Sequence, residues 1–305
     1  MPASNFNWFK TISEFHQFRG LPKPEHPLVS VINLADVNRL KAGETSILLD
    51  FYSIALKRNF NAKIKYGQQE YDFDEGIMFF ISPKQLFRIE VEEDSFLNQS
   101  GWMLLIHPDF LWNTTLAKKI KQYEYFSYAV NEALYLSDKE ETTIADIMHN
   151  IEREYHSNID QFSQDVIIAQ LELLLTYAER YYHRQFLTRK ITNHSILNKL
   201  ENILDVYFNN DSLLQKGIPT VQYVADALNV SPNYLSGLLK VLTGQSTQQH
   251  IHSKLIEKAK EKLTVTGLSV SEIAYELGFE HPQSFSKLFK SKTNVSPLEF
   301  RQSFN

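Results

Sequence analysis

The chain has 305 residues, a formal net charge of −5 and no cysteine. The lack of cysteine excludes disulfides and thiolate chemistry. The N-terminus has no secretory signal, and no apolar run approaches the roughly 20 residues of a membrane span. We therefore expect a cytoplasmic protein without membrane contact.

Residues 29–107 alternate apolar and polar side chains and are rich in aromatic residues. This pattern predicts short strands separated by turns. Several such strands at close spacing indicate a sandwich or small barrel, which we place in a domain of residues 1–136. The predicted strands are residues 29–34, 46–56, 62–66, 76–81, 86–91 and 102–106.

The aromatic side chains of these strands have two interpretations. Tyr52, Phe80 and Trp102 are candidates for lining an effector pocket, although core packing is the commoner role for each. Lys57 and Arg58 follow the second strand, where either could meet an anionic or sugar ligand or be a solvated surface residue.

From residue 137 the pattern becomes helical. Ser137 and Glu140 form a capping box, and a second amphipathic helix is predicted at residues 163–183. Its wide apolar arc fits packing on its own domain or a two-fold dimer contact, for which the candidates are Leu171, Leu174 and Leu175. Residues 137–187 form this helical segment, and polar residues 188–194 are predicted to be an exposed link.

Residues 195–305 contain one pattern written twice, which indicates two copies of one supersecondary unit. At an offset of 49, the matching pairs are Val224/Ile273, Ala225/Ala274, Leu228/Leu277 and Asn229/Gly278. At an offset of 50, they are Pro232/Pro282, Leu235/Phe285, Ser236/Ser286, Leu239/Phe289 and Lys240/Lys290.

Each copy predicts a helix, a tight turn and a second helix. Asn229 and Gly278 accept the left-handed backbone that a sharp turn needs, and Ser231-Pro232 has the residue types that begin a helix. The two helix-turn-helix motifs span about 221–242 and 270–292. An amphipathic helix at residues 247–263 can hold their second helices about one DNA turn, ~34 Å, apart.

Three spaced motifs of this region resemble the AraC/XylS family of bacterial transcription regulators. They are Ile273-Ala274-x-x-Leu277-Gly278-Phe279, Phe285-Ser286-x-x-Phe289-Lys290 and Ser296-Pro297-x-x-Phe300-Arg301. The resemblance covers roughly residues 200–302. It implies an all-α, homeodomain-like double helix-turn-helix domain, and the N-terminal strands are similar to the cupin-type jelly-roll sensor of such regulators. The expected fold class is α+β.

The resemblance also implies positions that contact DNA. Gly237 departs from the long base-reading side chain that many members carry. The alternative is that these residues are the solvated faces of amphipathic helices. The base-contact candidates are Asn233, Ser236, Gln283, Ser286 and Lys287, and the phosphate-contact candidates are Ser231, Tyr234, Lys240, His281 and Lys290.

The predicted function is a homodimeric regulator of double-stranded promoter or operator DNA. By resemblance it responds to a small effector, such as a sugar or related metabolite, and contacts RNA polymerase if it is an activator. Two alternatives stay open: a barrel that is only a dimerisation scaffold, and a cupin-class enzyme fused to a DNA-binding domain. We expect no enzyme activity, metal or cofactor, since His16, His26 and His107 are isolated and no catalytic arrangement is evident.

Overall fold

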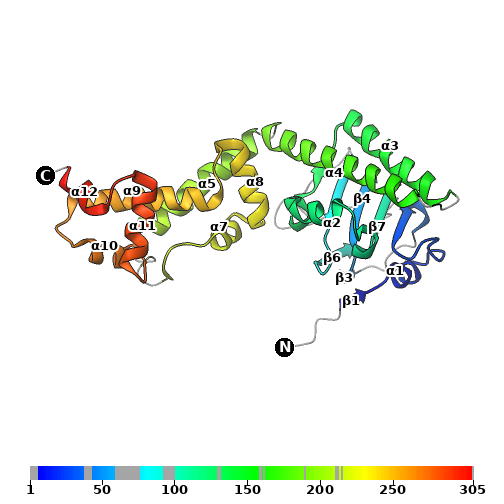
Figure 1. Ribbon diagram of the computed structural model, residues 1–305, viewed down its shortest axis with the longest axis horizontal. Coiled ribbons are helices and arrows are strands. Elements are labelled where there is room, and N and C mark those ends of the chain that lie inside the picture. Colours follow the sequence, from blue (N-terminus) through cyan, green and yellow to red (C-terminus); the bar gives the residue numbers. More distant parts are fainter. Residues whose placement is uncertain are drawn as a thin grey trace. The chain divides into compact units, whose positions relative to one another are not determined.

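The computed structural model describes residues 6–37, 43–58, 76–91, 100–128, 132–157, 160, 162–188, 190–209, 213 and 216–303. The chain divides into two compact units, Met1–Gln185 and Phe186–Asn305. The first combines sheets with helices and the second is helical (Figure 1). The fold is therefore of mixed α and β type, as predicted.

The N-terminal unit contains two sheets. The three-stranded sheet has the order β1-β3-β6, and the five-stranded sheet has the order β2-β7-β4-β5-β8. All neighbouring strands are antiparallel except β1 and β3. The strands are β1 Phe6–Phe9, β2 Val29–Asn33, β3 Gly43–Leu49, β4 Tyr52–Arg58, β5 Ile77–Ile81, β6 Leu86–Val91, β7 Ser100–Ile106 and β8 Leu134–Tyr135.

The prediction of one continuous strand at residues 46–56 is wrong, because the chain passes from one sheet to the other within this range. β3 ends at Leu49 and β4 begins at Tyr52. The amide of Asp50 donates to the Phe9 carbonyl, and its carboxylate accepts from the Trp8 indole at 2.8 Å. The continuous apolar run hides this break from a periodicity analysis. The strand predicted at 62–66 lies outside the described residues, and the other four predicted strands are confirmed with ends shifted by at most two residues.

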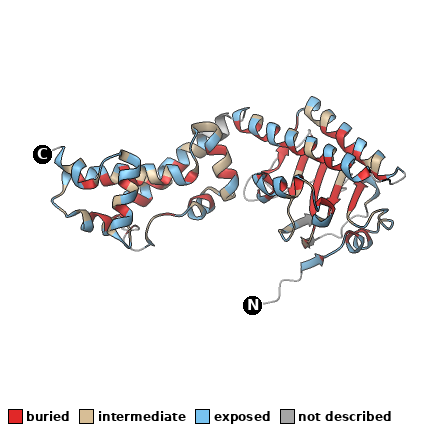
Figure 2. Cartoon of the chain, viewed as in Figure 1, coloured by how far each residue is buried: buried red, intermediate tan, exposed pale blue. Residues whose placement is uncertain are grey.

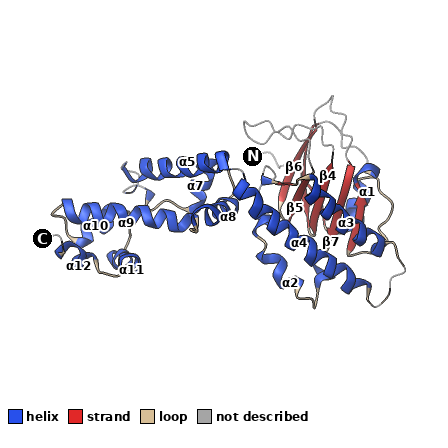
Figure 3. Cartoon of the chain, turned by 90° about the horizontal axis from the view of Figure 1, so that it is seen from above, coloured by secondary structure: helices blue, strands red, loops and turns tan. Residues whose placement is uncertain are grey.

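The two faces of the five-stranded sheet have different neighbours. One face carries Tyr52 and Leu56 of β4 and is covered by helices α3 (Asp138–Tyr155) and α4 (Ser163–Thr188), as Figures 1 and 3 show. The other face, here called the inner face, packs on the three-stranded sheet and on α1 (Ile12–Phe18). Because both faces are covered, the strands of this sheet are largely buried (Figure 2).

Short helices lie between strands of this unit. The helix η1 Leu34–Asp36 follows β2, whereas η2 Pro108–Leu111, α2 Leu116–Lys119, η3 Ile120–Gln122 and η4 Glu124–Ser127 lie between β7 and β8. The predicted capping box of Ser137 and Glu140 is present at the start of α3. Within the described residues, no helix is both long and apolar enough to cross a lipid bilayer.

Two predictions about the helical segment need correction. Leu171, Leu174 and Leu175 are fully buried by their own chain, so they form core contacts and leave no side-chain surface for a second copy. Residues 190–194, predicted to be exposed link, belong to helix α5 (Lys190–Asn209), and α4 continues to Thr188. No proline or glycine interrupts this polar stretch, so composition alone misjudged it.

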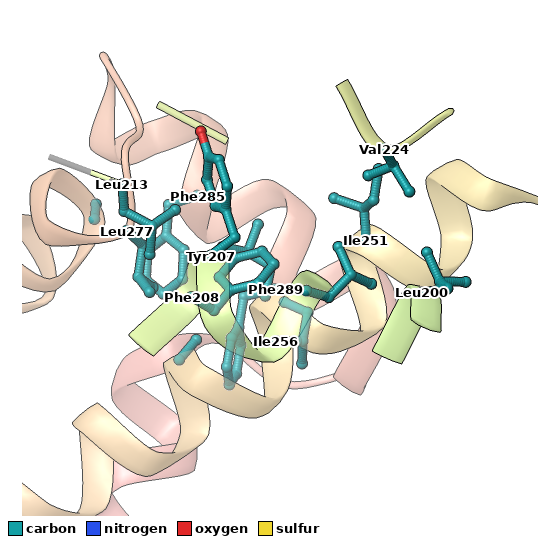
Figure 4. Close-up of a cluster of buried hydrophobic side chains, with 14 of the residues drawn as sticks. Leu200, Tyr207, Phe208, Leu213, Val224, Ile251, Ile256, Leu277, Phe285 and Phe289 are labelled. Atoms are coloured by element: carbon teal, nitrogen blue, oxygen red, sulfur yellow. The ribbon is translucent and has the colours of Figure 1, made fainter. Parts of the chain in front are cut away.

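The C-terminal unit packs its helices around one apolar core. Phe285 and Phe289 are fully buried at its centre, beside Tyr207 and Phe208 of α5 (Figure 4). Phe289 also contacts the ring of Phe300 with centroids 5.5 Å apart. The helices after α5 are α7 Val221–Leu228, α8 Pro232–Thr243, α9 Thr247–Val265, α10 Val270–Glu276, α11 Pro282–Thr293 and α12 Pro297–Gln302.

Candidate nucleic-acid interface

The two predicted turns share one backbone geometry. Asn229 has φ 55° and Gly278 has φ 81°, both in the left-handed region that ends a helix sharply. In each copy the next amide donates back across the turn: Val230 to the Ala225 carbonyl at 3.1 Å, and Phe279 to the Ala274 carbonyl at 3.0 Å. The internal repeat of the sequence is therefore a repeat of structure.

The second turn also makes a close backbone contact. A Cβ atom at Gly278 would lie 2.9 Å from the Gly217 Cα and 3.0 Å from the Leu213 carbonyl oxygen. These are backbone atoms and cannot rotate away. The turn between α10 and α11 is thus held against the segment between α5 and α7, and glycine is required for packing as well as for its backbone conformation.

The second helix of each motif begins at a serine- or histidine-proline pair. The Ser231 hydroxyl accepts from the Tyr234 amide at 3.2 Å, and Pro232 occupies the first turn of α8. His281 stands at the same place before α11, where its side chain makes no capping hydrogen bond. The predicted starts of both helices are confirmed.

Matching side chains form an exposed row on each of these helices. On α11 the row is Gln283, Lys287 and Lys290, at positions i, i+4 and i+7, and all three are exposed. On α8 the corresponding residues are Asn233, Gly237 and Lys240, of which Asn233 and Lys240 are exposed. Neither helix contains an acidic residue, so both rows attract phosphate.

The other candidates have packing roles. Tyr234 is buried against Phe186, with ring centroids 5.2 Å apart. Ser236 is half-buried, and its hydroxyl lies 3.0 Å from that of the fully buried Thr247. Ser286 is also half-buried.

The comparisons with known proteins agree with this geometry. Residues 224–303, which include both second helices, match a family model described as a helix-turn-helix domain. The C-terminal unit contains an AraC-type helix-turn-helix domain.

Similar proteins share this part of the chain. An uncharacterized HTH-type transcriptional regulator from the cgkA 5' region of Pseudoalteromonas carrageenovora is 33% identical over 116 residues, which are 38% of this chain and 64% of that protein. The transcriptional regulatory protein YesN of Bacillus subtilis is 39% identical over 79 residues, which are 25% of this chain and 22% of that protein. This chain therefore spans less than two thirds of either relative.

Among solved structures, the C-terminal domain of AraT, a response regulator from Geobacillus stearothermophilus, is 32% identical. The match covers 35% of this chain and 84% of that one, with a TM-score of 0.31.

Helix α9 links the two motifs of the AraC-type domain. Its 19 residues span about 28 Å at 1.5 Å per residue. Lys254 reaches Asp205 of α5 at 2.5 Å, and this hydrogen bond raises the pKa of Lys254. Lys262 pairs with Glu276 of α10 at 2.6 Å. These α9 lysines thus hold neighbouring helices rather than adding to the exposed rows.

Arg301 fixes the connection between α9 and α10. Its guanidinium donates to the carbonyl of Leu263 at 3.2 Å and to that of Leu268 at 2.6 Å. The arginine lies on α12 and satisfies two backbone acceptors that are distant in sequence. The motif spacing marked Arg301 as a family residue, but only the fold shows that it positions the second motif.

His250 makes a similar bridge between α8 and α9. Its Nε2 atom lies 2.8 Å from the Thr243 hydroxyl, and burial lowers its pKa. His252 lies two residues further and contacts Gln248 instead. Within the described part of the chain, no group of three or more His, Asp or Glu residues is arranged to hold a metal ion.

The three effector-pocket candidates do not converge on one pocket. Phe80 and Tyr52 both contact Phe126, with ring centroids 5.5 and 5.2 Å apart. Trp102 lies on β7, separated from β5 by β4, and its indole donates to Glu152 of α3 at 3.2 Å. All three belong to the helix-covered face of the sheet, and Phe80 lines a small cavity there, with room for about one water molecule.

Proposed function

We propose that this protein is a transcription regulator that binds a specific sequence in double-stranded DNA through α8 and α11. The observation that carries the proposal is the repeated turn and helix, each with an outward row of amide and lysine side chains and no acidic residue. Amides of Asn233 and Gln283 can pair with adenine, and Lys287 can reach guanine. Lys240 and Lys290 are suited to phosphate, which positions the protein without reading sequence.

The proposal is tested by selecting bound duplexes from a random library with the full-length protein at two salt concentrations. We expect an enriched site with two elements about 10 base pairs apart, one for each recognition helix. Affinity should fall with salt because lysine–phosphate contacts release counterions. Recovery of unselected sequence at both salt concentrations would refute sequence-specific binding.

We also propose that the protein is a homodimer whose contact lies on the exposed side of α4. Phe162, directly before α4, and Val166 and Leu173 on the helix are 60%, 42% and 45% exposed, and their separations of four and seven residues fit a coiled-coil spacing. Asp165 lies at the start of this stripe, and Arg180 lies about two helical turns beyond Leu173. In an antiparallel pair these charges would face the opposite charge of the second copy.

The dimer is tested by sedimentation of the full-length protein. Leu173→Glu should shift the mass from dimer to monomer, because it places a charge in an apolar contact. Lys139→Glu, an exposed change on α3, is the matched control and should leave the mass unchanged. A dimer that persists in Leu173→Glu would refute this surface.

The N-terminal unit is proposed to sense a small effector and bias how the dimer spans its DNA site. That requires an effector with different affinity for the DNA-competent and DNA-incompetent arrangements. If the unit is only a dimerisation scaffold, no ligand should alter its thermal unfolding. If the protein activates transcription, RNA polymerase is a further partner.

A further inference from the structure

The structural repeat extends beyond the two helix-turn-helix motifs into the helix that follows each of them. The C-cap of α8 is Gly244 with φ 74°, and that of α11 is Asn294 with φ 65°, both in the left-handed region. The next helices, α9 and α12, begin after Ser246 and Ser296, and each serine forms a capping box. The contacts that hold α8 on α9 can therefore be compared with those that hold α11 on α12, at the offset of 50 residues.

In the first motif, a pair of hydroxyl groups joins α8 to α9. The Ser236 Oγ atom lies 3.0 Å from the Thr247 Oγ atom. Thr247 is the first residue of α9 and is fully buried, so its hydroxyl needs a hydrogen-bond partner within the protein. Ser236 stands three residues after Asn233 and four before Lys240, on the same side of α8 as the exposed row. A residue of the DNA-facing side thus satisfies a buried hydroxyl.

A second polar contact holds the C-terminal end of α8. The Thr243 hydroxyl donates to the Leu239 carbonyl at 2.8 Å, so it accepts the hydrogen bond from the His250 Nε2 atom of α9, also at 2.8 Å. Thr243 lies seven residues after Ser236, which is about two helical turns. Because the two contacts lie at different heights, α8 cannot slide along α9 or turn about its own axis without breaking one of them.

The second motif cannot form the hydroxyl pair. Pro297 occupies the place of Thr247 at the start of α12, and its ring has no hydroxyl. Ser286, the counterpart of Ser236, is half-buried on α11. The same residue type at the same place of the repeat therefore has a buried hydroxyl to satisfy in the first motif, but no such group in the second.

An apolar contact replaces the other bridge. Phe300 of α12 occupies the place of His250, and its ring centroid lies 5.5 Å from that of Phe289 on α11. Phe289 is fully buried. Helix α11 is thus held on α12 through its buried side.

The two exposed rows also differ in the bases they can read. On α11, Gln283 and Lys287 both carry groups that can pair with a base edge. On α8, Asn233 is the counterpart of Gln283, but Gly237 stands at the place of Lys287 and has no side-chain donor or acceptor. The row of α8 therefore has one fewer base-reading side chain.

We infer that Ser236 is a positioning residue, which fixes α8 on α9 through the Thr247 hydroxyl, and that α11 supplies most of the base specificity. Loss of the Ser236 hydroxyl then weakens binding to every sequence alike. The inference rests on the sequence-specific binding proposed above and states how the specificity is divided between the two helices.

Urea unfolding of the full-length protein, followed by far-UV circular dichroism, tests the hydroxyl pair without DNA. Ser236→Ala leaves the Thr247 hydroxyl buried without this partner, so the unfolding midpoint of the C-terminal unit should fall. Adding Thr247→Val removes both hydroxyls and should restore most of the loss. Ser286→Ala is the matched control and should leave the midpoint unchanged. Additive effects of Ser236→Ala and Thr247→Val would overturn the pair.

Binding to mutated versions of a selected duplex tests the role in DNA recognition. Ser236→Ala should weaken binding to every version by the same factor, about three- to tenfold, which is the worth of one neutral hydrogen bond. Ser236→Ala combined with Thr247→Val should regain most of this affinity, which a hydroxyl that reads a base could not do. A changed base preference in Ser236→Ala, or no recovery in the combined variant, would overturn the positioning role.

The selected site itself tests the division of specificity. We expect one strongly specified element, assigned to α11 by the effect of Gln283→Ala, and one weakly specified element about one helical turn away. Two equally specified elements would overturn the division and leave sequence-specific binding in place. Recovery of unselected sequence would overturn sequence-specific binding and the division together, whereas the urea result decides the hydroxyl pair in either case.

Discussion

Replacement of Gly278 by alanine tests the packing of the second helix-turn-helix motif. An alanine at φ 81° lowers the free energy of unfolding by about 1–2 kcal/mol, because its backbone must stay left-handed. Its Cβ atom would also lie 2.9–3.0 Å from backbone atoms of Gly217 and Leu213. Overpacking of this kind costs about 1–3 kcal/mol, so Gly278→Ala should destabilise the C-terminal unit by roughly 2–5 kcal/mol.

Gly244 provides the matched control. It has φ 74°, but a Cβ atom there would meet no atom within 4 Å. Gly244→Ala should therefore lose only the backbone part, about 1–2 kcal/mol. Both variants place the same residue in the same backbone region, so the difference between them measures the clash.

Urea unfolding followed by two probes separates the units. The tryptophans are Trp8, Trp102 and Trp112, all in the N-terminal unit, so tryptophan fluorescence reports that unit. Far-UV circular dichroism also reports the helical C-terminal unit. Gly278→Ala should move the circular dichroism transition and leave the fluorescence transition in place. Equal destabilisation by the two alanines would refute the packing argument.

Three further predictions concern the AraC-type domain. In a binding series on mutated sites, Gln283→Ala should relax base preference at one position by about 1–3 kcal/mol. Lys290→Ala should weaken binding to all sequences alike and make the affinity less dependent on salt concentration. A sequence-selective loss of affinity in Lys290→Ala would contradict its phosphate role. Arg301→Lys should destabilise the C-terminal unit by roughly 1–3 kcal/mol in urea unfolding, because an ammonium cannot reproduce the fork that meets two carbonyls; unchanged stability would show that the clamp is dispensable. Burial lowers the pKa of His250, so its contribution to stability is present above its unfolded pKa of about 6.5 and is lost as pH falls below that value. Unfolding midpoints at several pH values should show that His250→Gln loses less stability on acidification than the unchanged protein. An identical loss in both proteins would contradict this role of His250.

The helix-turn-helix region could be predicted from local sequence signals. Asn229 and Gly278 mark the turns, the proline pairs mark helix starts, and the spacing of Leu235, Leu239, Phe285 and Phe289 marks the buried sides. Each signal acts within a few residues, so it survives without knowledge of the rest of the fold. The contacts of Gly278 and Arg301 could not be predicted, because their partners are distant in sequence.

The N-terminal unit was less predictable because its strands pair over long distances. The apolar run through Leu49 and Tyr52 does not reveal that the chain changes sheets. The alternation of β4 separates Tyr52 from Lys57, but which face the helices cover depends on the whole unit. For the same reason, the sequence could not show that the pocket candidates Tyr52, Phe80 and Trp102 all lie on the face that the helices cover.

The wide apolar arc of α4 explains the error at the dimer contact. Leu171, Leu174 and Leu175 are the most apolar part of the helix, and the chain uses them for its own core. The less apolar side, with Val166 and Leu173, is the exposed one. Hydrophobicity alone ranks buried residues above those that can meet a partner.

Recognition of DNA by two helices held on α9 is tested most directly by hydroxyl-radical footprinting of the full-length protein on a duplex recovered by selection. We expect two protected segments for each bound DNA-binding domain, about one helical turn apart on the same face of the duplex. The segment read by α11 should be lost when Gln283→Ala is combined with Lys287→Ala. Single, continuous protection unchanged by that double variant would contradict recognition by two helices held on α9.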